Sequence, residues 1–190
     1  MNKHLTSENG VNKLHTAFIF LLGQQDYNSI TIKQITKAAG MNRTTYYLFY
    51  NNKLELARDI CNTFLDDYIE IFMKSFGGYD INTKVLIKDA FYNLRKNKKM
   101  LLGLWSIQES SFSPYVQMQE SIKNSIYDYL VNHHIKMLYE GSELFFAELY
   151  AANVMATVKW WITNEDYSFE SIYQTIYVCT EKGVLQLLKK

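Results

Sequence analysis

The stretch that decides the fold is residues 30–47, ITIKQITKAAGMNRTTYY. It divides into two short segments with helical patterning, one on each side of Gly40. Thr31 precedes the first segment and Asn42 precedes the second, and an oxygen at such a position can accept a hydrogen bond from a backbone N–H two or three residues on. Glycine ends a helix readily because it adopts the left-handed conformation. Two capped short helices joined by a glycine-containing turn indicate a helix-turn-helix.

Helical spacing of apolar residues extends from this stretch in both directions. It predicts an amphipathic helix over about 6–23, the pair itself at 32–39 and 43–50, and a long helix over 53–76 with one apolar stripe. Two glycines at 77 and 78 close the long helix. Five further helices are predicted beyond them, at about 81–96, 98–109, 114–139, 143–164 and 168–188.

The composition supports an all-helical protein. The 190 residues include one proline, Pro114, and eight glycines, and 48% of them are apolar, so the chain can fill a real core with few helix breaks. No stretch reaches the ~18 uncharged apolar residues of a membrane span, and the N-terminus has no apolar core of a signal peptide. We therefore expect a cytoplasmic protein without a membrane partner.

Charge is unevenly distributed along the chain. Residues 1–56 carry six Lys and Arg against three Asp and Glu, a balance of +3, and residues 57–190 carry 14 against 16, a balance of −2. A mildly basic head on a mildly acidic body fits a DNA-contacting end joined to a separate sensor. Many solvated surfaces carry similar charge, so the distribution agrees with DNA binding without establishing it.

The second short helix of a helix-turn-helix can lie in the major groove, with its N-terminal side chains aimed at base edges. Arg43 can pair with a guanine edge, and Thr44 can contact a thymine methyl group. The groove-facing candidates are Asn42, Arg43, Thr44, Thr45, Tyr46 and Tyr47, and those suited to phosphate oxygens are Thr31, Lys33, Thr45, Tyr47 and Lys53. The same pattern also fits a solvated helix start with its aromatic side chains turned inward.

Residues 30–47, followed by KLEL at 53–56, resemble the N-terminal signature of the TetR family of transcriptional regulators. That signature reads T-[VI]-x-x-I-A-x-x-A-G-[VM]-[SN]-x-x-[TS]-[LF]-Y-x-x-F-x-x-K-x-x-L. By this resemblance, Thr31 caps the first helix of the pair, and Thr45, Tyr47 and Lys53 contact phosphates. The sequence departs from the signature at Thr36, Tyr46 and Tyr50, which we interpret as packing variants.

The resemblance implies an all-α fold of about nine helices. Residues 1–52 would form a three-helix helix-turn-helix DNA-binding domain, and 53–190 a helical effector-binding and dimerisation domain, with 53–76 as the linking helix. It implies a homodimeric repressor that leaves a pseudo-palindromic double-stranded operator when a small molecule binds, with recognition helices about 34 Å apart or somewhat more. No cofactor and no enzymatic activity are expected, because the sequence has neither a glycine-rich phosphate loop nor a nucleophile elbow.

The last two helices hold the candidates for dimerisation. Small residues at 147, 151, 152 and 156 permit a close helix approach, and we expect these helices to pair with their copies in a four-helix bundle. The candidates include Phe145 and, foremost, Leu149, Ala152, Ala156, Trp161, Ile172 and Ile176. The same stripe also fits the core of a single chain.

The middle helices are rich in aromatic side chains that can line a cavity for an apolar or aromatic effector. The candidates are Phe91, Trp105, Tyr115, Met118, Tyr127 and Trp160, although aromatics at this spacing also fit a plain core. No metal is expected, because the adjacent His133 and His134 point about 100° apart on a helix. Cys61 and Cys179 read as small buried hydrophobic residues.

A second interpretation is a coactivator that keeps this fold but acts by binding another regulator. The segment NLRKN at 93–97 and the pair Trp160-Trp161 are similar to a subgroup of the family that includes such coactivators. The intact head argues for DNA binding instead, since Arg43, Tyr47 and Lys53 are all in place.

Overall fold

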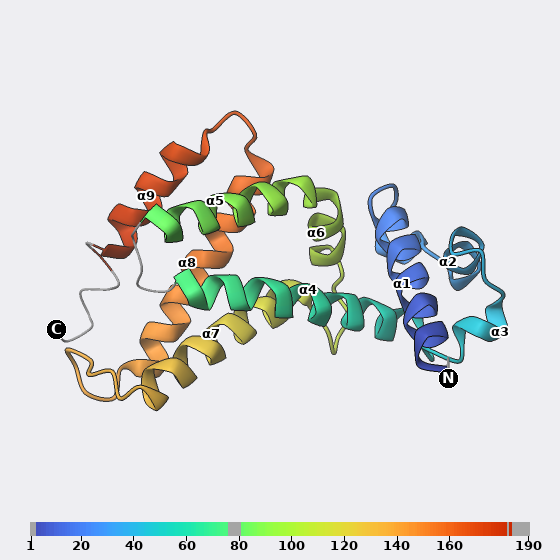
Figure 1. Ribbon diagram of the computed structural model, residues 1–190, viewed down its shortest axis with the longest axis horizontal. Coiled ribbons are helices and arrows are strands. Elements are labelled where there is room, and N and C mark those ends of the chain that lie inside the picture. Colours follow the sequence, from blue (N-terminus) through green and yellow to red (C-terminus); the bar gives the residue numbers. More distant parts are fainter. Residues whose placement is uncertain (1–2, 76–80, 182, 184–190) are drawn as a thin grey trace. The chain divides into compact units, whose positions relative to one another are not determined.

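The computed structural model describes residues 3–75, 81–181 and 183, and these residues form nine α-helices and one short 3-10 helix (Figure 1). Within this part of the chain there is no strand, only an isolated bridge between Glu109 and Phe112. The predicted all-α fold of about nine helices is confirmed. The elements are α1 Lys3–Leu22, η1 Tyr27–Ser29, α2 Ile32–Ala38, α3 Arg43–Tyr46, α4 Lys53–Ser75, α5 Ile81–Lys96, α6 Lys98–Trp105, α7 Pro114–Asn132, α8 Glu143–Thr163 and α9 Phe169–Glu181.

Several helices end earlier than the sequence pattern predicts. The helix predicted over 114–139 stops at Asn132, because His134 takes a φ of 50°. The N–H groups of His134 and Ile135 then donate to the carbonyls of Val131 and Leu130, which is the Schellman ending usually made by glycine. The helix predicted over 98–109 stops at Trp105, before the turn that pairs Glu109 with Phe112. The end of the last predicted helix lies outside the described residues.

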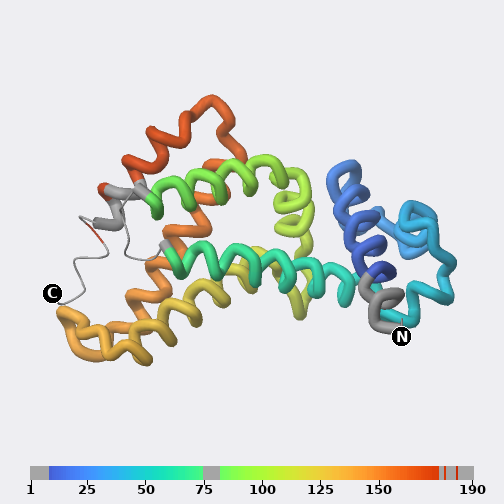
Figure 2. The backbone as a smooth tube through the Cα atoms, viewed as in Figure 1, coloured from blue at the N-terminus to red at the C-terminus, as the bar shows by residue number. Residues whose placement is uncertain are grey.

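The chain packs as two compact units. The head unit comprises Met1–Phe64 and Lys99–Pro114, and the body unit comprises Leu65–Lys98 and Tyr115–Lys190. Helix α4 contributes residues to both and runs without a break (Figure 2). The head unit therefore includes half of α4 and most of α6 as well as the helix-turn-helix. The predicted domain boundary between residues 52 and 53 stays a prediction.

The core of the head unit is made by apolar side chains from each of its longer helices. Leu14 and Phe18 of α1, Ile35 of α2 and Leu56 of α4 are completely buried. Cys61 of α4 is also completely buried, as predicted, and burial raises the pKa of its thiol to about 12. The side chain of Cys179 lies outside the described residues.

Helix α6 approaches the end of α1 so closely that only a glycine fits at the contact. A Cβ atom added to Gly103 would lie 2.9 Å from the carbonyl oxygen of Leu22 and 3.1 Å from the Leu22 Cβ. Real Cβ atoms do not come this near to a backbone oxygen, and a backbone atom cannot rotate away. Gly103 therefore fixes the distance between α1 and α6 inside the head unit.

We predict that Gly103→Ala destabilises the protein by about 1–3 kcal/mol, as overpacking does, although alanine is the better helix former. Thermal or urea unfolding followed by circular dichroism measures this change. Gly10→Ala is the matched control, since the three atoms nearest to its new Cβ, the closest at 2.6 Å, belong to the far end of the Phe49 ring, which can shift as a backbone oxygen cannot. Equal unfolding free energies for the two variants would contradict the close-approach argument.

In the body unit, α5 packs against α8 (Figure 1). Trp161 of α8 is completely buried, and its Nε1 donates to the Phe91 carbonyl at 2.9 Å. The Arg95 guanidinium lies 3.2 Å from the centre of the Trp161 ring. It also donates to the carbonyls of Trp161 and Asn164 at 3.0 and 3.2 Å, so it caps the end of α8. None of the described helices combines the length and the apolar character needed to cross a bilayer.

Candidate nucleic-acid interface

Helix α2 begins at Thr31, the predicted cap, which together with Gln34 forms a complete capping box. The Thr31 hydroxyl oxygen accepts from the Gln34 N–H at 3.2 Å, and the Gln34 side-chain oxygen accepts from the Thr31 N–H at 2.8 Å. At the other end Gly40 has a φ of 62°, and the N–H of Met41 donates to the Thr36 carbonyl at 2.9 Å. The predicted turn at Gly40 is therefore confirmed, and both ends of α2 are fixed.

Helix α3 is only four residues long, shorter than the predicted 43–50. The Asn42 side-chain oxygen accepts from the Thr45 N–H at 2.7 Å and from the Thr45 hydroxyl at 2.8 Å, so Asn42 is the predicted cap. After Tyr46 the backbone continues as a turn, with the N–H of Phe49 donating to the Tyr46 carbonyl. Asn42, Arg43 and Thr44 are exposed, and Thr45 is partly exposed.

Tyr46 does not face the groove as predicted, which corrects its assignment as a DNA-contacting residue. Its side chain is completely buried, and its hydroxyl donates to the Asn52 carbonyl at 3.0 Å. Burial, with a smaller contribution from the neighbouring Tyr47, raises the pKa of Tyr46 far above its usual value. Tyr46 thus anchors α3 to the chain that enters α4, while Tyr47 on the next position stays exposed.

Lys53 lies differently from the phosphate contact that the resemblance implies. Its ammonium group donates to the carbonyls of Tyr27 and Ile30 at 2.5 and 2.8 Å, and it lies 3.9 Å from the centre of the Tyr27 ring. Burial lowers the pKa of this amine, and the charge of Glu109 opposes that effect. Two of the three ammonium protons therefore hold the loop before α2. Lys33, by contrast, is exposed on α2.

A hydrogen-bonded cluster that the sequence did not predict joins three parts of the head unit. The buried Tyr50 donates its hydroxyl proton to Asp59 Oδ2 at 2.5 Å. His15 Nε2 lies 3.0 Å from the Tyr50 hydroxyl and 2.9 Å from the same Asp59 oxygen. Burial first, and the hydrogen bond to Asp59 second, raise the pKa of Tyr50. The hydroxyl thus ties the end of the helix-turn-helix to α1 and α4, beyond the packing role expected of Tyr50.

We predict that Tyr50→Phe lowers the free energy of unfolding by about 1 kcal/mol, the usual worth of one hydrogen bond. Asp59 keeps its partner His15 in that variant, so no buried charge is left unpaired. Chemical denaturation measures the effect. Tyr92→Phe serves as the control, because Tyr92 is exposed on α5. A loss of the same size in both variants would show that the cluster adds no stability.

Two of the six residues predicted for an effector site lie at the surface of the single chain. Tyr127 and Trp160 are 38% and 39% exposed, so these two do not line a closed cavity in the single chain. Phe91 packs on Trp161 and Phe169 in the core. Met118 is buried and Tyr115 lies below the Lys159 ammonium, and Trp105 is part of α6 in the head unit. For Phe91, Trp105, Tyr115 and Met118, the effector role stays a prediction.

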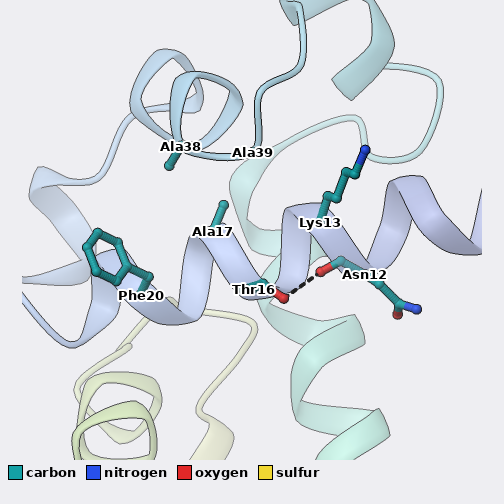
Figure 3. A pocket seen from close by; sticks show the side chains of 7 residues that line it. All are labelled: Asn12, Lys13, Thr16, Ala17, Phe20, Ala38 and Ala39. Carbon is teal, nitrogen blue, oxygen red and sulfur yellow. Dashed lines mark hydrogen bonds between the residues drawn. The ribbon is translucent and has the colours of Figure 1, made fainter.

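The structure has a groove of about 510 Å³ that sequence reasoning missed, on the head unit between α1 and α2. Figure 3 shows Phe20 at one end of this groove and Lys13 at the other. Phe20 is 58% exposed, and the floor is made by small side chains. The lining residues are Asn12, Lys13, Thr16, Ala17, Phe20, Ala38 and Ala39. Among the described residues, no three His, Cys, Asp or Glu side chains gather in a way that could hold a metal ion.

Comparison with known proteins identifies the fold. No protein-family model matches this chain, and no curated protein is similar to it in sequence. A TetR transcriptional regulator from Streptococcus agalactiae is similar in structure, with a TM-score of 0.64 and 18% identity over 98% of this chain and 97% of that one. The chain therefore has the fold of TetR-family transcriptional regulators.

Two further solved structures show the same likeness. The dihydroxyacetone kinase operon activator DhaS has a TM-score of 0.59 and 17% identity over 95% of this chain and 98% of that one. The TetR family repressor AlkX from Dietzia, implicated in biodegradation of n-alkanes, has a TM-score of 0.56 and 14% identity, with the same coverage of 95% and 98%. The fold that the resemblance implied is thus confirmed over nearly the whole chain.

Proposed function

We propose that this protein is a cytoplasmic, non-enzymatic transcriptional regulator that binds a pseudo-palindromic double-stranded DNA operator. The observation that carries this proposal is the start of α3, where Asn42 caps the helix and leaves Arg43 and Thr44 exposed beside it. Side chains at this end of a recognition helix reach base edges when the helix enters the major groove. The proposed phosphate contacts are the exposed Lys33 on α2 and the exposed cap residue Thr31 just before it.

The output of regulation is proposed to be repression, relieved when an apolar or aromatic small molecule binds the body unit. The sequence resemblance and the likeness to the repressor AlkX support this direction, whereas DhaS shows that an activator has the same fold. A ligand acts in such a system by favouring one arrangement of the two heads over another. The coupling free energy is typically about 1–3 kcal/mol.

The coactivator interpretation is not favoured. It depended on the segment 93–97 and on the pair Trp160-Trp161, and in the structure these residues have a packing role. Arg95 lies on the Trp161 ring and caps α8, and Trp160 packs on Tyr167 with ring centres 4.6 Å apart. These contacts account for the motif without a second regulator.

The proposed homodimer forms through one exposed face of α8. Phe145, Leu149, Ala152, Ala156 and Trp160 recur every three or four residues, so they lie on one side of the helix. Phe145 is 62% exposed and Leu149 is 39% exposed. The predicted set is corrected at two positions, because Trp161 and Ile172 are buried within the single chain. The side chain of Ile176 lies outside the described residues.

We predict that Leu149→Glu converts the protein to a monomer at micromolar concentration. In a twofold interface both chains contribute the same surface patch. The two introduced carboxylates therefore lie in one interface, where their repulsion costs several kcal/mol. Light scattering coupled to size-exclusion chromatography measures the mass. Val116→Glu is the control, since Val116 is exposed on α7. A dimer that survives Leu149→Glu would place the interface elsewhere.

We predict that the protein selects specific duplexes from a randomised double-stranded DNA pool, and that binding weakens as salt rises. Lys33→Gln should weaken binding to every duplex by a similar factor and reduce the salt slope by about two, one for each head of the proposed dimer. Fluorescence anisotropy at several salt concentrations measures both quantities. Lys136→Gln, which removes an exposed charge from the body unit, should change neither. Failure of the wild-type protein to enrich any sequence would refute the proposed function.

A further inference from the structure

The one cation at the start of α3 is held by a residue one turn further along the chain. The Arg43 guanidinium donates from Nη2 to the Tyr47 hydroxyl oxygen at 3.0 Å and from Nε at 3.3 Å. Its central carbon lies 5.6 Å from the centre of the Tyr47 ring. Both side chains are exposed, where a free arginine would sample many rotamers and lose that freedom on binding.

The Tyr47 ring itself rests on a buried support. It packs edge-on against the Tyr46 ring, with centres 5.6 Å apart and an angle of 87° between the planes. Tyr46 is completely buried and hydrogen-bonded to the Asn52 carbonyl. Arg43 is therefore held by an exposed ring whose neighbour belongs to the core, and the direction of the guanidinium is coupled to the core of the head unit.

The contact with Tyr47 occupies one particular edge of the guanidinium. Arginine has two edges that present a pair of parallel N–H groups, one between Nε and Nη2 and one between Nη1 and Nη2. Tyr47 accepts from the first edge. The second edge stays free, and it matches the O6 and N7 acceptors of guanine. Tyr47 accepts both bonds through its oxygen, so its own O–H remains available to donate to a phosphate oxygen.

We propose that Tyr47 is the positioning residue for base recognition: it directs the free edge of Arg43 to a guanine while its hydroxyl proton binds the phosphate backbone. This inference rests on the proposed DNA binding and deepens it. A phosphate contact alone would set the register of the head without carrying sequence information. Through the bond to Arg43, the same hydroxyl determines which base the head distinguishes.

The test uses a duplex that the wild-type protein selects from a randomised pool, together with versions in which each base pair is replaced singly. Arg43→Ala identifies the base pair that Arg43 reads, because only there does the variant lose discrimination. A bidentate pair supplies about 1–3 kcal/mol, or roughly 5- to 150-fold. Tyr47→Phe keeps the ring against Tyr46 and removes only the hydroxyl. We expect Tyr47→Phe to lose most of the discrimination at that base pair.

The double variant Arg43→Ala/Tyr47→Phe separates positioning from a direct contact. If Tyr47 acts through Arg43, discrimination in the double variant equals that of Arg43→Ala alone. Arg43→Lys should behave like Arg43→Ala in discrimination, since lysine keeps the charge but lacks the fork. Tyr92→Phe, on the exposed face of α5, controls for loss of a tyrosine hydroxyl, and thermal unfolding verifies that each variant is folded.

Three results would overturn the inference, and they are distinguishable. If Tyr47→Phe weakens binding to all duplexes by one factor, Tyr47 is a phosphate contact only. If Arg43→Ala changes no base preference, Arg43 does not read a base, and Tyr47 cannot act by positioning it. If the wild-type protein selects no duplex, the proposed function fails first and this inference fails with it.

Discussion

The whole head depends on the capping of two helices that are too short to exist alone. Helices of seven and four residues are unstable in water, because nucleation is unfavourable and few hydrogen bonds follow it. Here each begins at a side chain that satisfies the free N–H groups, Thr31 with Gln34 and Asn42 with Thr45. Gly40 then reverses the chain between them. The direction of α3, and with it the place of Arg43, follows from these local bonds.

The caps stabilise the two short helices, and contacts with the core of the head unit fix their orientation. Tyr46, Tyr50 and Lys53 each belong to the segment that the family signature covers, and each points inward. Tyr46 bonds to the Asn52 carbonyl, Tyr50 to Asp59, and Lys53 to the carbonyls of the loop before α2. These bonds connect α3 and α4 to parts of the chain up to 26 residues away. The sequence pattern predicted DNA-contacting or packing roles for these three residues. In the structure their hydrogen bonds hold the parts of the head unit together.

Sequence reasoning found the features that local chemistry determines, namely the caps at Thr31 and Asn42 and the turn at Gly40. It misplaced Tyr46, because four helical residues are too few for periodicity to define an inner face. It placed Trp161 at a dimer surface, because α8 carries apolar residues on all sides and the pattern cannot tell which side is covered. Ile172 of α9 was placed there as well, although α9 turns this residue into the core of its own chain. Sequence reasoning also missed the end of α7 at Asn132, because His134, and not a glycine, takes the positive φ that ends this helix. The burial of Tyr46, Trp161 and Ile172 comes from tertiary packing, which a local pattern does not contain, whereas the end of α7 is a local backbone conformation that His134 adopts in place of glycine.

In the proposed function, the segments that make up the head unit determine how an effector signal reaches DNA. The segment 99–114 belongs to the head unit although it lies far from the helix-turn-helix in sequence. Its α6 meets α1 at Gly103, and its following loop is held by Arg58, which donates to the Ser111 carbonyl at 3.0 Å. The chain passes between the units after residues 64, 98 and 114. In the proposed function, a ligand that shifts the body unit would act on the head unit along these three stretches of chain. The last two of them flank segment 99–114, which is packed on α1 and α4. Because α1 packs in turn against α2, movement of that segment would be passed to the helix-turn-helix through α1, while the local caps keep the two short helices folded.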